Sequence, residues 1–328
     1  MPKRLVFTGK QQVSLESFEL DNLNPGQVRL KSICSLMSTG TENICFNRLF
    51  EPGSHWDRWV KYPFYPGYST VAQVEAVGEG VTQFKAGDRV VTRRGHASHH
   101  IVNVDQCSLL PEGIDVDDAA WFALAKITAM GARAAQYQLG DSVVIIGAGP
   151  IGQMSIRWAA AAGAQRIIVA DIVEMRLKMA LAGGATHTVA RSIDQALEEI
   201  KALNGGQQPR LVIDTTGNET VFTHALALPA RFGRVVVLGD TGMPTHQHLT
   251  SDVITRGITI VGAHDGHETP EWNGPRIYSL FFDLLKSKRF NVAGLNTHTF
   301  TPAECKKAYE VCNTQRGQTM GILFDWSR

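Results

Sequence analysis

At 328 residues, the chain is long enough for two domains with separate hydrophobic cores. Hydrophobic residues make up 44% of it and charged residues 19%, as in ordinary globular proteins that fold in water. A formal net charge of +1 gives no electrostatic signature of a nucleic-acid or anionic-membrane partner. No unbroken apolar run reaches the roughly 18 residues of a membrane span, and the N-terminus resembles a first strand rather than a signal peptide.

The five cysteines are odd in number, widely scattered and never arranged as CxxC. This usage indicates neither a disulfide framework nor a structural zinc knuckle. We therefore expect a reduced, cytoplasmic protein that acts on a small molecule, with no nucleic acid and no membrane as partner.

Residues 1–124 are predicted to form a compact β-barrel-like domain. Short β-rich runs at 27–36, 70–78, 88–94 and 99–104 are separated by Gly, Pro and Asp. The Ala-rich stretch 117–138 then has helical spacing.

Residues 125–262 are predicted to form a second domain, in which strands and helices alternate. The runs "SVVIIGAG", "RIIVADI", "RLVIDTTG", "GRVVVLGDTG" and "GITIVGAHDG" have the apolar character of strands buried on both faces. This alternation indicates an α/β fold with a doubly wound parallel sheet.

The remaining segment, 263–328, contains an amphipathic helix at 276–290 and a second helical stretch within 300–313. It ends in an apolar strand at 320–326. We expect this strand to return to the first domain.

The glycines of a GxGxxG motif, Gly147, Gly149 and Gly152, lie between a predicted strand and a predicted helix. In this context the first permits a tight turn, the second lets the backbone approach a pyrophosphate, and the third lets helix and strand pack closely. The helix N-terminus then faces the phosphates. Asp171, at the end of the next strand, can accept hydrogen bonds from the adenosine ribose and repel a 2′-phosphate, which predicts NAD rather than NADP.

Further cofactor contacts are expected in the first turn after the motif, near Asp171, at the carboxyl ends of the later strands and in the first domain. The residues are Pro150, Ile151, Arg176, Thr216, Gly217, Leu238, Gly239, Ala263 and Thr39. For the strand-end residues, turning the chain is the alternative role.

The whole chain resembles the medium-chain dehydrogenase/reductase superfamily, which includes the zinc alcohol dehydrogenases. The resemblance is carried by "VGEGVTQFKAGDRV", by the "KITA" helix and by "DSVVIIGAGPIGQ". It implies a GroES-like catalytic domain beside a Rossmann domain for the cofactor, and a homodimer joined through the last strand of the Rossmann sheet, here 257–263.

This sequence departs from the zinc-dependent members at every ligand position. The family's catalytic Cys position is Thr39, its His-Glu pair is Tyr68-Ser69, and its third ligand falls near Ala123. The four-cysteine structural lobe is also missing between Val91 and Gly95. We therefore predict no metal. "STGTE" (38–42) and "PGYS" (66–69) are similar to a zinc-free branch that contains bacteriochlorophyllide dehydrogenase.

A site without zinc needs another group to handle the hydroxyl proton. Tyr68 is a candidate because it stands at a former ligand position, although it could simply fill the space left by the metal. Lys126 is a second candidate: it lies in the Ala-rich segment, where apolar neighbours would suit acid–base work, but it could instead pair with a carboxylate or hold the cofactor ribose. Glu42 and His96 are weaker candidates.

Two loops rich in Trp, His and Asp, 55–59 and 264–272, could line the substrate site or be ordinary packed loops. The favoured function is zinc-independent, NAD-dependent oxidation of a polar secondary alcohol, such as a sugar or cyclitol, to its ketone. An enone or quinone reductase is one alternative, and Asp171 counts against it. A nucleotide-binding protein without turnover is the other.

Overall fold

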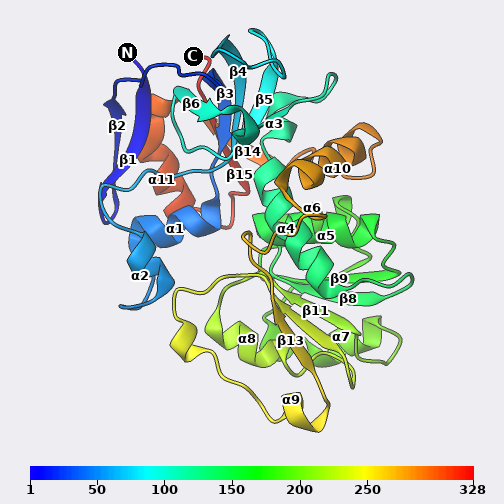
Figure 1. The fold of residues 1–328 in the computed structure, drawn as a ribbon. Coiled ribbons are helices and arrows are strands. Elements are labelled where there is room, and N and C mark those ends of the chain that lie inside the picture. The colour runs from blue at the N-terminus through cyan, green and yellow to red at the C-terminus, as the bar shows by residue number, and fades with distance from the viewer.

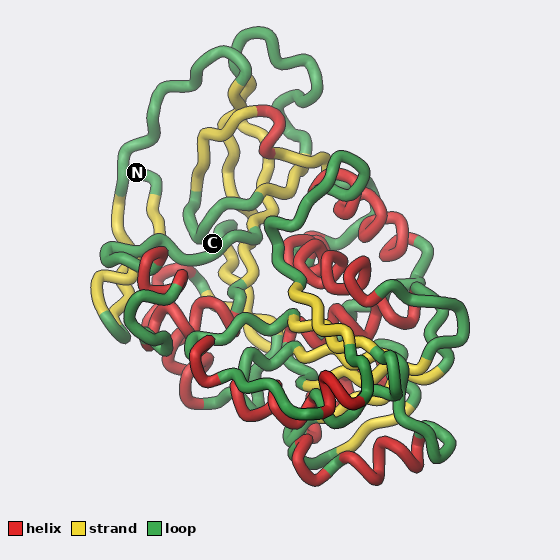
Figure 2. Tube along the Cα trace, turned by 60° about the horizontal axis from the view of Figure 1, so that its bottom comes forward, coloured by secondary structure: helices red, strands yellow, loops and turns green.

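Two large β-sheets and a short two-stranded ribbon organise the chain (Figure 1). The computed structural model describes all residues 1–328. The ribbon pairs β1 (Lys3–Gly9) with β2 (Gln12–Ser17). Figure 2 shows the strands of the two large sheets as separate groups. The chain is therefore α/β, with a β-rich part and an alternating part, as predicted.

The first large sheet has the order β14-β15-β3-β4-β5-β7, with β6 paired to β3. It is antiparallel except for the parallel pair β14 and β15. The predicted return of the C-terminal strand is confirmed, because β15 pairs with β3. The strands are β3 (Gln27–Leu36), β4 (Thr70–Val77), β5 (Arg89–Thr92), β6 (His99–Asn103), β7 (Cys107–Leu109), β14 (Asn296–Phe300) and β15 (Gly321–Asp325).

The second large sheet is wholly parallel, with the order β10-β9-β8-β11-β12-β13. The chain order reverses between β8 and β11, and ligands of such sheets bind at this switch point, beyond the carboxyl ends of the strands. The strands are β8 (Ser142–Ile146), β9 (Arg166–Ala170), β10 (His187–Val189), β11 (Leu211–Asp214), β12 (Arg234–Val237) and β13 (Thr259–Gly262).

Helices cover the sheets and connect their strands (Figure 1). Every helix is too short or too polar to span a membrane. The α-helices are α1 (Thr39–Asn47), α2 (His55–Trp59), α3 (Val116–Ala119), α4 (Phe122–Ala135), α5 (Pro150–Ala161), α6 (Glu174–Ala182), α7 (Leu197–Leu203), α8 (Glu219–Ala225), α9 (Asp252–Thr255), α10 (Gly274–Lys286) and α11 (Cys305–Thr314). The 3₁₀ turns are η1 (Val104–Gln106), η2 (Ile193–Gln195), η3 (Pro244–His246) and η4 (Pro302–Glu304).

The expected single helix over 117–138 is in fact two, α3 and α4, separated at Ala120 and Trp121. The Ser69 hydroxyl donates to the Ala120 carbonyl at 2.5 Å, and the indole of Trp121 donates to Asn296 at 2.9 Å. These tertiary contacts hold the break, which the alanine spacing did not indicate. α4 also crosses the predicted domain boundary at 124/125; the three-part division of the chain stays a prediction.

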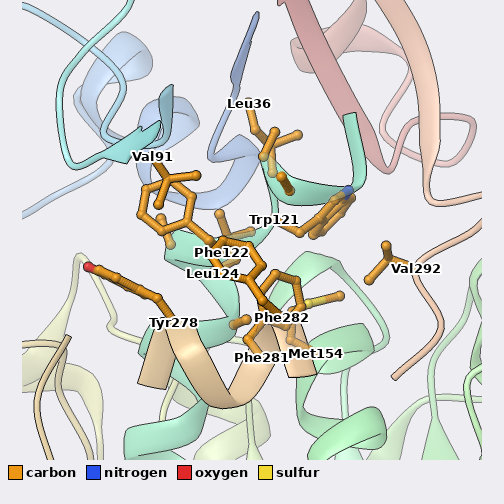
Figure 3. Close-up of a cluster of buried hydrophobic side chains, with 14 of the residues drawn as sticks. Leu36, Val91, Trp121, Phe122, Leu124, Met154, Tyr278, Phe281, Phe282 and Val292 are labelled. Carbon is orange, nitrogen blue, oxygen red and sulfur yellow. The ribbon is translucent and has the colours of Figure 1, made fainter. Parts of the chain in front are cut away.

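The α4 helix contributes Ala135 to the hydrophobic cluster of the parallel sheet. A separate cluster of 27 buried residues joins α4, α5 and α10 to the first large sheet. It takes Leu36 and Val91 from the first sheet, Met154 from α5 and Phe281 from α10. Figure 3 shows these side chains around Phe122, with the Tyr278 oxygen pointing away from the others. Shared burial of this kind fixes α4, and therefore Lys126, relative to both sheets.

Candidate active site

The phosphate-binding loop has the geometry that its glycines predicted. Gly147 has φ +85°, and a Cβ on Gly152 would lie 2.0 Å from the Gly147 carbonyl oxygen. A Cβ on Gly149 would instead meet no atom within 4 Å. Gly149 precedes α5 and supplies no side-chain cap, so the N–H groups of Ile151 and Gly152 have no side-chain acceptor. This arrangement fits a pyrophosphate.

Asp171 lies just beyond β9 and faces this loop. Its carboxylate accepts the N–H of Ala148 at 2.6 Å and of Val173 at 2.8 Å. A carboxylate has about four acceptor positions, so it can still receive ribose hydroxyls. The Arg176 guanidinium lies 4.0 Å away, and its Nε has no hydrogen-bond partner. The residues present therefore fit a dinucleotide.

The remaining cofactor candidates lie in three places. One set lies at the adjacent carboxyl ends of β11, β12 and β13 and consists of Thr216, Gly217, Leu238, Gly239 and Ala263. The packing there is tight, because a Cβ on Gly239 would lie only 2.2 Å from the Gly217 nitrogen. Pro150 and Ile151 form the first turn of α5. Thr39 begins α1 in the β-rich part of the chain and makes no side-chain hydrogen bond to these residues.

Three hydroxyls meet around Tyr68, a position where the resemblance implies a zinc ligand, and we call Ser38, Thr41 and Tyr68 the hydroxyl cluster. Ser38 is the N-cap residue of α1, yet its side chain makes no capping bond. Its hydroxyl bonds the Tyr68 hydroxyl instead, and Thr41 Oγ1 lies 3.4 Å from the same oxygen. Burial raises the pKa of the Tyr68 phenol, against smaller lowering effects of Ser38, Thr41 and Arg93. The phenol is therefore protonated at neutral pH.

These residues do not fit zinc. Zinc binds thiolate, imidazole or carboxylate, whereas Tyr68 and Ser69 offer hydroxyls and Ala123 offers no donor at all. The Ser69 hydroxyl is also engaged with a backbone carbonyl. Nowhere in the structure do three or more His, Cys, Asp or Glu side chains gather closely enough to hold a metal ion.

Glu42 and His96 are buried directly beneath the hydroxyl cluster, and each is at most 2% exposed. The Glu42 carboxylate lies 3.2 Å from His96 Nε2 and accepts the Ser38 N–H at 2.7 Å and the Tyr309 hydroxyl. His96 lies before β6 rather than on that strand. Its ring fills the space below Gly67, where a Cβ would be 2.7 Å away. The pair thus supports the backbone on both sides of the hydroxyl cluster.

Lys126 has charged neighbours, so the expectation of an apolar environment was wrong. Its ammonium contacts Asp265 at 2.8 Å and Glu268 at 2.7 Å, and it also donates to the Asp265 carbonyl. Both carboxylates come from the loop that joins β13 to α10, 263–273, which the local sequence around Lys126 did not reveal. Pairing with a carboxylate had been an open alternative.

Arg93 links Lys126 to the hydroxyl cluster. Its guanidinium contacts Asp265 at 2.7 Å and lies 4.7 Å from the centre of the Tyr68 ring. We call Arg93, Lys126, Asp265 and Glu268 the charged cluster. Sequence reasoning missed Arg93 and Ser38, although a charged residue ending strand "DRVVTRR" and a serine beginning "STGTE" were both visible.

A second contact joins the two parts of the chain at the loop that follows β12. His55 Nε2 lies 2.8 Å from Asp240, and the Trp56 indole donates to the Thr241 carbonyl at 3.1 Å. Segment 55–59, expected to be a loop, is the short helix α2, and it contacts the loop that follows β12, with His55 half exposed. His264 and His267 mainly turn the chain after β13, where His264 Nδ1 accepts the Gly266 N–H.

A polar cavity of about 260 Å³ opens beside the charged cluster. Its lining residues are Thr92, Arg93, Arg94, Asp105, Gln106, Ser108, Glu268, Gly274, Pro275 and Tyr278. A larger cavity of about 450 Å³ lies between segments 113–118 and 285–292 and shares no residue with either cluster. The smaller cavity is therefore the one that borders the charged cluster, through Arg93 and Glu268.

A Rossmann-type sheet with a phosphate-binding loop, facing a GroES-like part that carries hydroxyls, defines a nucleotide-dependent oxidoreductase. Comparison with known families agrees. Residues 36–114 match the alcohol dehydrogenase GroES-like domain, and residues 150–276 match the zinc-binding dehydrogenase domain. The chain belongs to the medium-chain dehydrogenase/reductase superfamily and is an alcohol dehydrogenase-like enzyme.

Individual relatives are distant but extend over nearly the whole chain. L-threonine 3-dehydrogenase of Bacillus subtilis (strain 168) is 28% identical over 321 residues, covering 87% of this chain and 86% of its own. Sorbitol dehydrogenase of Mus musculus is 25% identical, covering 98% and 95%. A crystal structure of a short chain alcohol dehydrogenase from Escherichia coli CFT073, complexed with cofactor NADH, has a TM-score of 0.83 at 20% identity, covering 99% of each chain. The last match shows the fold alone.

Proposed function

We propose that this protein is a zinc-independent, NAD-dependent dehydrogenase that interconverts a polar secondary alcohol, such as a sugar or cyclitol, and its ketone. The observation that carries the proposal is the hydroxyl cluster, in which Tyr68 stands at a position where the resemblance implies a metal ligand. The substrates in the names of the relatives, L-threonine and sorbitol, support a polar alcohol. The polar cavity beside the charged cluster supports the same class.

NAD is the proposed cofactor because Asp171 faces the phosphate-binding loop. Its negative charge would repel the 2′-phosphate of NADP, and its free acceptor positions suit ribose hydroxyls. When bound, the nicotinamide supplies the hydride acceptor or donor. An enone or quinone reductase with NADPH is disfavoured by the same carboxylate.

Tyr68 is the proposed proton-transfer residue. In ketone reduction, its phenol donates a proton to the carbonyl oxygen while hydride reaches the carbonyl carbon, and alcohol oxidation is the reverse. The raised pKa of Tyr68 suits a donor that stays protonated at neutral pH. Ser38 and Thr41 orient the phenol and can return a proton to it from water.

The other predicted catalytic residues receive supporting roles in this proposal. The Glu42 carboxylate accepts the Ser38 N–H, and the His96 ring packs against Gly67. Both residues therefore position the backbone that carries the hydroxyl cluster. The Lys126 ammonium fixes the 263–273 loop and places positive charge near the reacting oxygen. A positive charge there stabilises a developing alkoxide.

A substrate screen tests the proposal directly. Purified protein is mixed with NAD⁺ and, separately, with NADP⁺ and sorbitol, myo-inositol, glucose, 2,3-butanediol or L-threonine, and formation of the reduced cofactor is followed by absorbance. We expect turnover with a polyol or sugar and NAD⁺, unchanged after chelator treatment, with no stoichiometric zinc in metal analysis. Activity that disappears with a bound zinc would refute zinc independence, and NAD⁺ binding without any turnover would favour the non-catalytic alternative.

A further inference from the structure

We propose that Arg93 is a positioning residue that stabilises the phenolate form of Tyr68 with its positive charge. The inference deepens the proposed function, because it rests on proton transfer by Tyr68. It concerns a part of the reaction for which the family elsewhere uses a metal ion. The argument starts from where the side chain of Arg93 is held.

Arg93 directly follows β5 and points into the space between the two sheets. Its guanidinium carbon lies 4.7 Å from the centre of the Tyr68 ring. The two terminal nitrogens contact the Asp265 carboxylate at 2.7 Å and 3.4 Å, and 29% of the side chain is exposed. A planar guanidinium can meet a ring and a carboxylate at once. The cation is therefore held against the phenol by a fixed counter-ion.

The charges around Tyr68 come from several elements, and Arg93 is the cation nearest its ring. From α1, Glu42 opposes ionisation of Tyr68. Three donors, from Ser38, His96 and Tyr309, already engage that carboxylate. The Lys126 ammonium forms ion pairs with two carboxylates of the 263–273 loop, those of Asp265 and Glu268.

Tyr278 is a second phenol beside Arg93, and it serves as a comparison. Burial, with smaller contributions from Asp265 and Glu268, raises the pKa of Tyr278 to about 12, against the lowering effect of Arg93. Tyr68 has the same cation, but it also has two hydroxyls bonded to its oxygen. Stabilisation of an ionised phenol by Arg93 is therefore most useful at Tyr68.

The proton balance of the step explains why a cation is needed. In ketone reduction the phenol O–H bond of Tyr68 breaks and a new O–H bond forms on the substrate oxygen, as hydride reaches the carbonyl carbon. The phenol is left as an anion until water reprotonates it through Ser38 or Thr41. A guanidinium over the ring lowers the free energy of that anion. Alcohol oxidation, which begins from the anion, gains by the same interaction.

Arg94 provides a matched control. It is the next residue in the chain, has the same side chain, and donates to Gln106 Oε1 at 2.6 Å instead of lying on Tyr68. Loss of Arg94 removes the same formal charge from the same loop. Any effect that depends on contact with the ring should therefore separate the two arginines.

The experiment replaces Tyr68 alone with a fluorinated tyrosine, whose phenol is more acidic than that of tyrosine and whose ¹⁹F resonance reports ionisation. Its pKa is measured by NMR titration in the otherwise unchanged protein and in Arg93→Gln, Arg93→Lys, Arg94→Gln and Asp265→Asn. We expect Arg93→Gln to raise the pKa by about one unit or more, equivalent to about a tenfold change in ionisation. Arg93→Lys should raise it less, Arg94→Gln should leave it nearly unchanged, and Asp265→Asn should lower it, because a neutralising carboxylate is lost.

An unchanged pKa in Arg93→Gln, or equal shifts in the Arg93 and Arg94 variants, would overturn the inference. If Arg93→Gln does not fold, Arg93→Lys and Asp265→Asn still test it, because they must shift the pKa in opposite directions. A loss of substrate affinity without a change in this pKa would make Arg93 a substrate-binding residue instead. Tyr68→Phe with full activity would refute the proposed function of Tyr68 separately, since the titration needs no substrate.

Discussion

Asp171 is the residue on which cofactor choice depends. Its carboxylate faces the phosphate-binding loop through the Ala148 N–H. Asp171→Ser removes the acceptor for the ribose hydroxyls and the charge that repels a 2′-phosphate. We expect kcat/KM with NAD to fall about tenfold or more, since a hydrogen bond to a charged group contributes about 1.5–3 kcal/mol, while kcat/KM with NADP rises. Parallel kinetics with both cofactors measure the change, and tighter binding of NADP by the unsubstituted protein would contradict it.

Lys126 gives a second prediction at this scale. Lys126→Met keeps the length of the side chain but leaves Asp265 and Glu268 without their cation. We expect kcat to fall by about 10²–10³, the usual range when one group that stabilises a developing oxyanion is removed, with little change in the Kd for NAD. Activity that recovers fully at saturating NAD would show that Lys126 only holds the cofactor. Lys126→Arg, which keeps the charge, should retain more activity than Lys126→Met.

At the scale of elements, the turn from β8 into α5 allows two functions of glycine to be separated. A Cβ on Gly152 would overlap the Gly147 carbonyl oxygen, so Gly152→Ala must push α5 away from β8. Overpacking of this kind costs about 1–3 kcal/mol, and we expect a lower Tm together with weaker NAD binding. Differential scanning fluorimetry and calorimetric titration give the two quantities.

Gly149→Ala is the comparison within the same turn. The added methyl group meets no protein atom within 4 Å, because it projects into the space where the pyrophosphate is expected. Tm should therefore stay close to that of the unsubstituted protein, while the Kd for NAD rises about tenfold or more, since backbone N–H contacts to the phosphates are lost. If NAD binds equally well to Gly149→Ala, the cofactor does not lie against this turn.

At the scale of the whole molecule, β13 is one of the two edge strands of the parallel sheet. Thr259 and Ala263 donate their N–H groups to the β12 side, at Gly233 and Val237, so by alternation the Ile260 N–H faces outward. An unprotected edge of this kind favours pairing with a second copy. We expect a homodimer, with a solution mass about twice the 35.9 kDa of one chain.

A pair of substitutions tests this edge. Ile260→Pro removes the outward donor and should give a monomer, whereas Ile260→Ala loses the same packing but keeps the N–H and should remain a dimer. Light scattering after gel filtration at micromolar concentration measures both. A monomeric unsubstituted protein, or a dimer that Ile260→Pro does not affect, would rule out pairing through β13.

The sequence by itself determined the fold class, the strands of the parallel sheet and the glycine turn between β8 and α5. Those features are local: apolar runs specify the buried strands, alternation with helices specifies the parallel sheet, and Gly147, Gly149 and Gly152 act within one turn. The family resemblance implies that Thr39, Tyr68 and a position near Ala123 replace zinc ligands, and this placement stays a prediction.

Only the tertiary structure decided what surrounds Lys126 and Tyr68. The counter-ions of Lys126 come from a loop more than 130 positions away in the chain, and side-chain pairing over such a separation leaves no local pattern. Arg93 and Arg94 are chemically identical neighbours in the sequence. Packing places one over Tyr68 and the other against Gln106. The direction of a side chain between two domains is set by how their surfaces meet, and the order of residues alone does not contain that geometry.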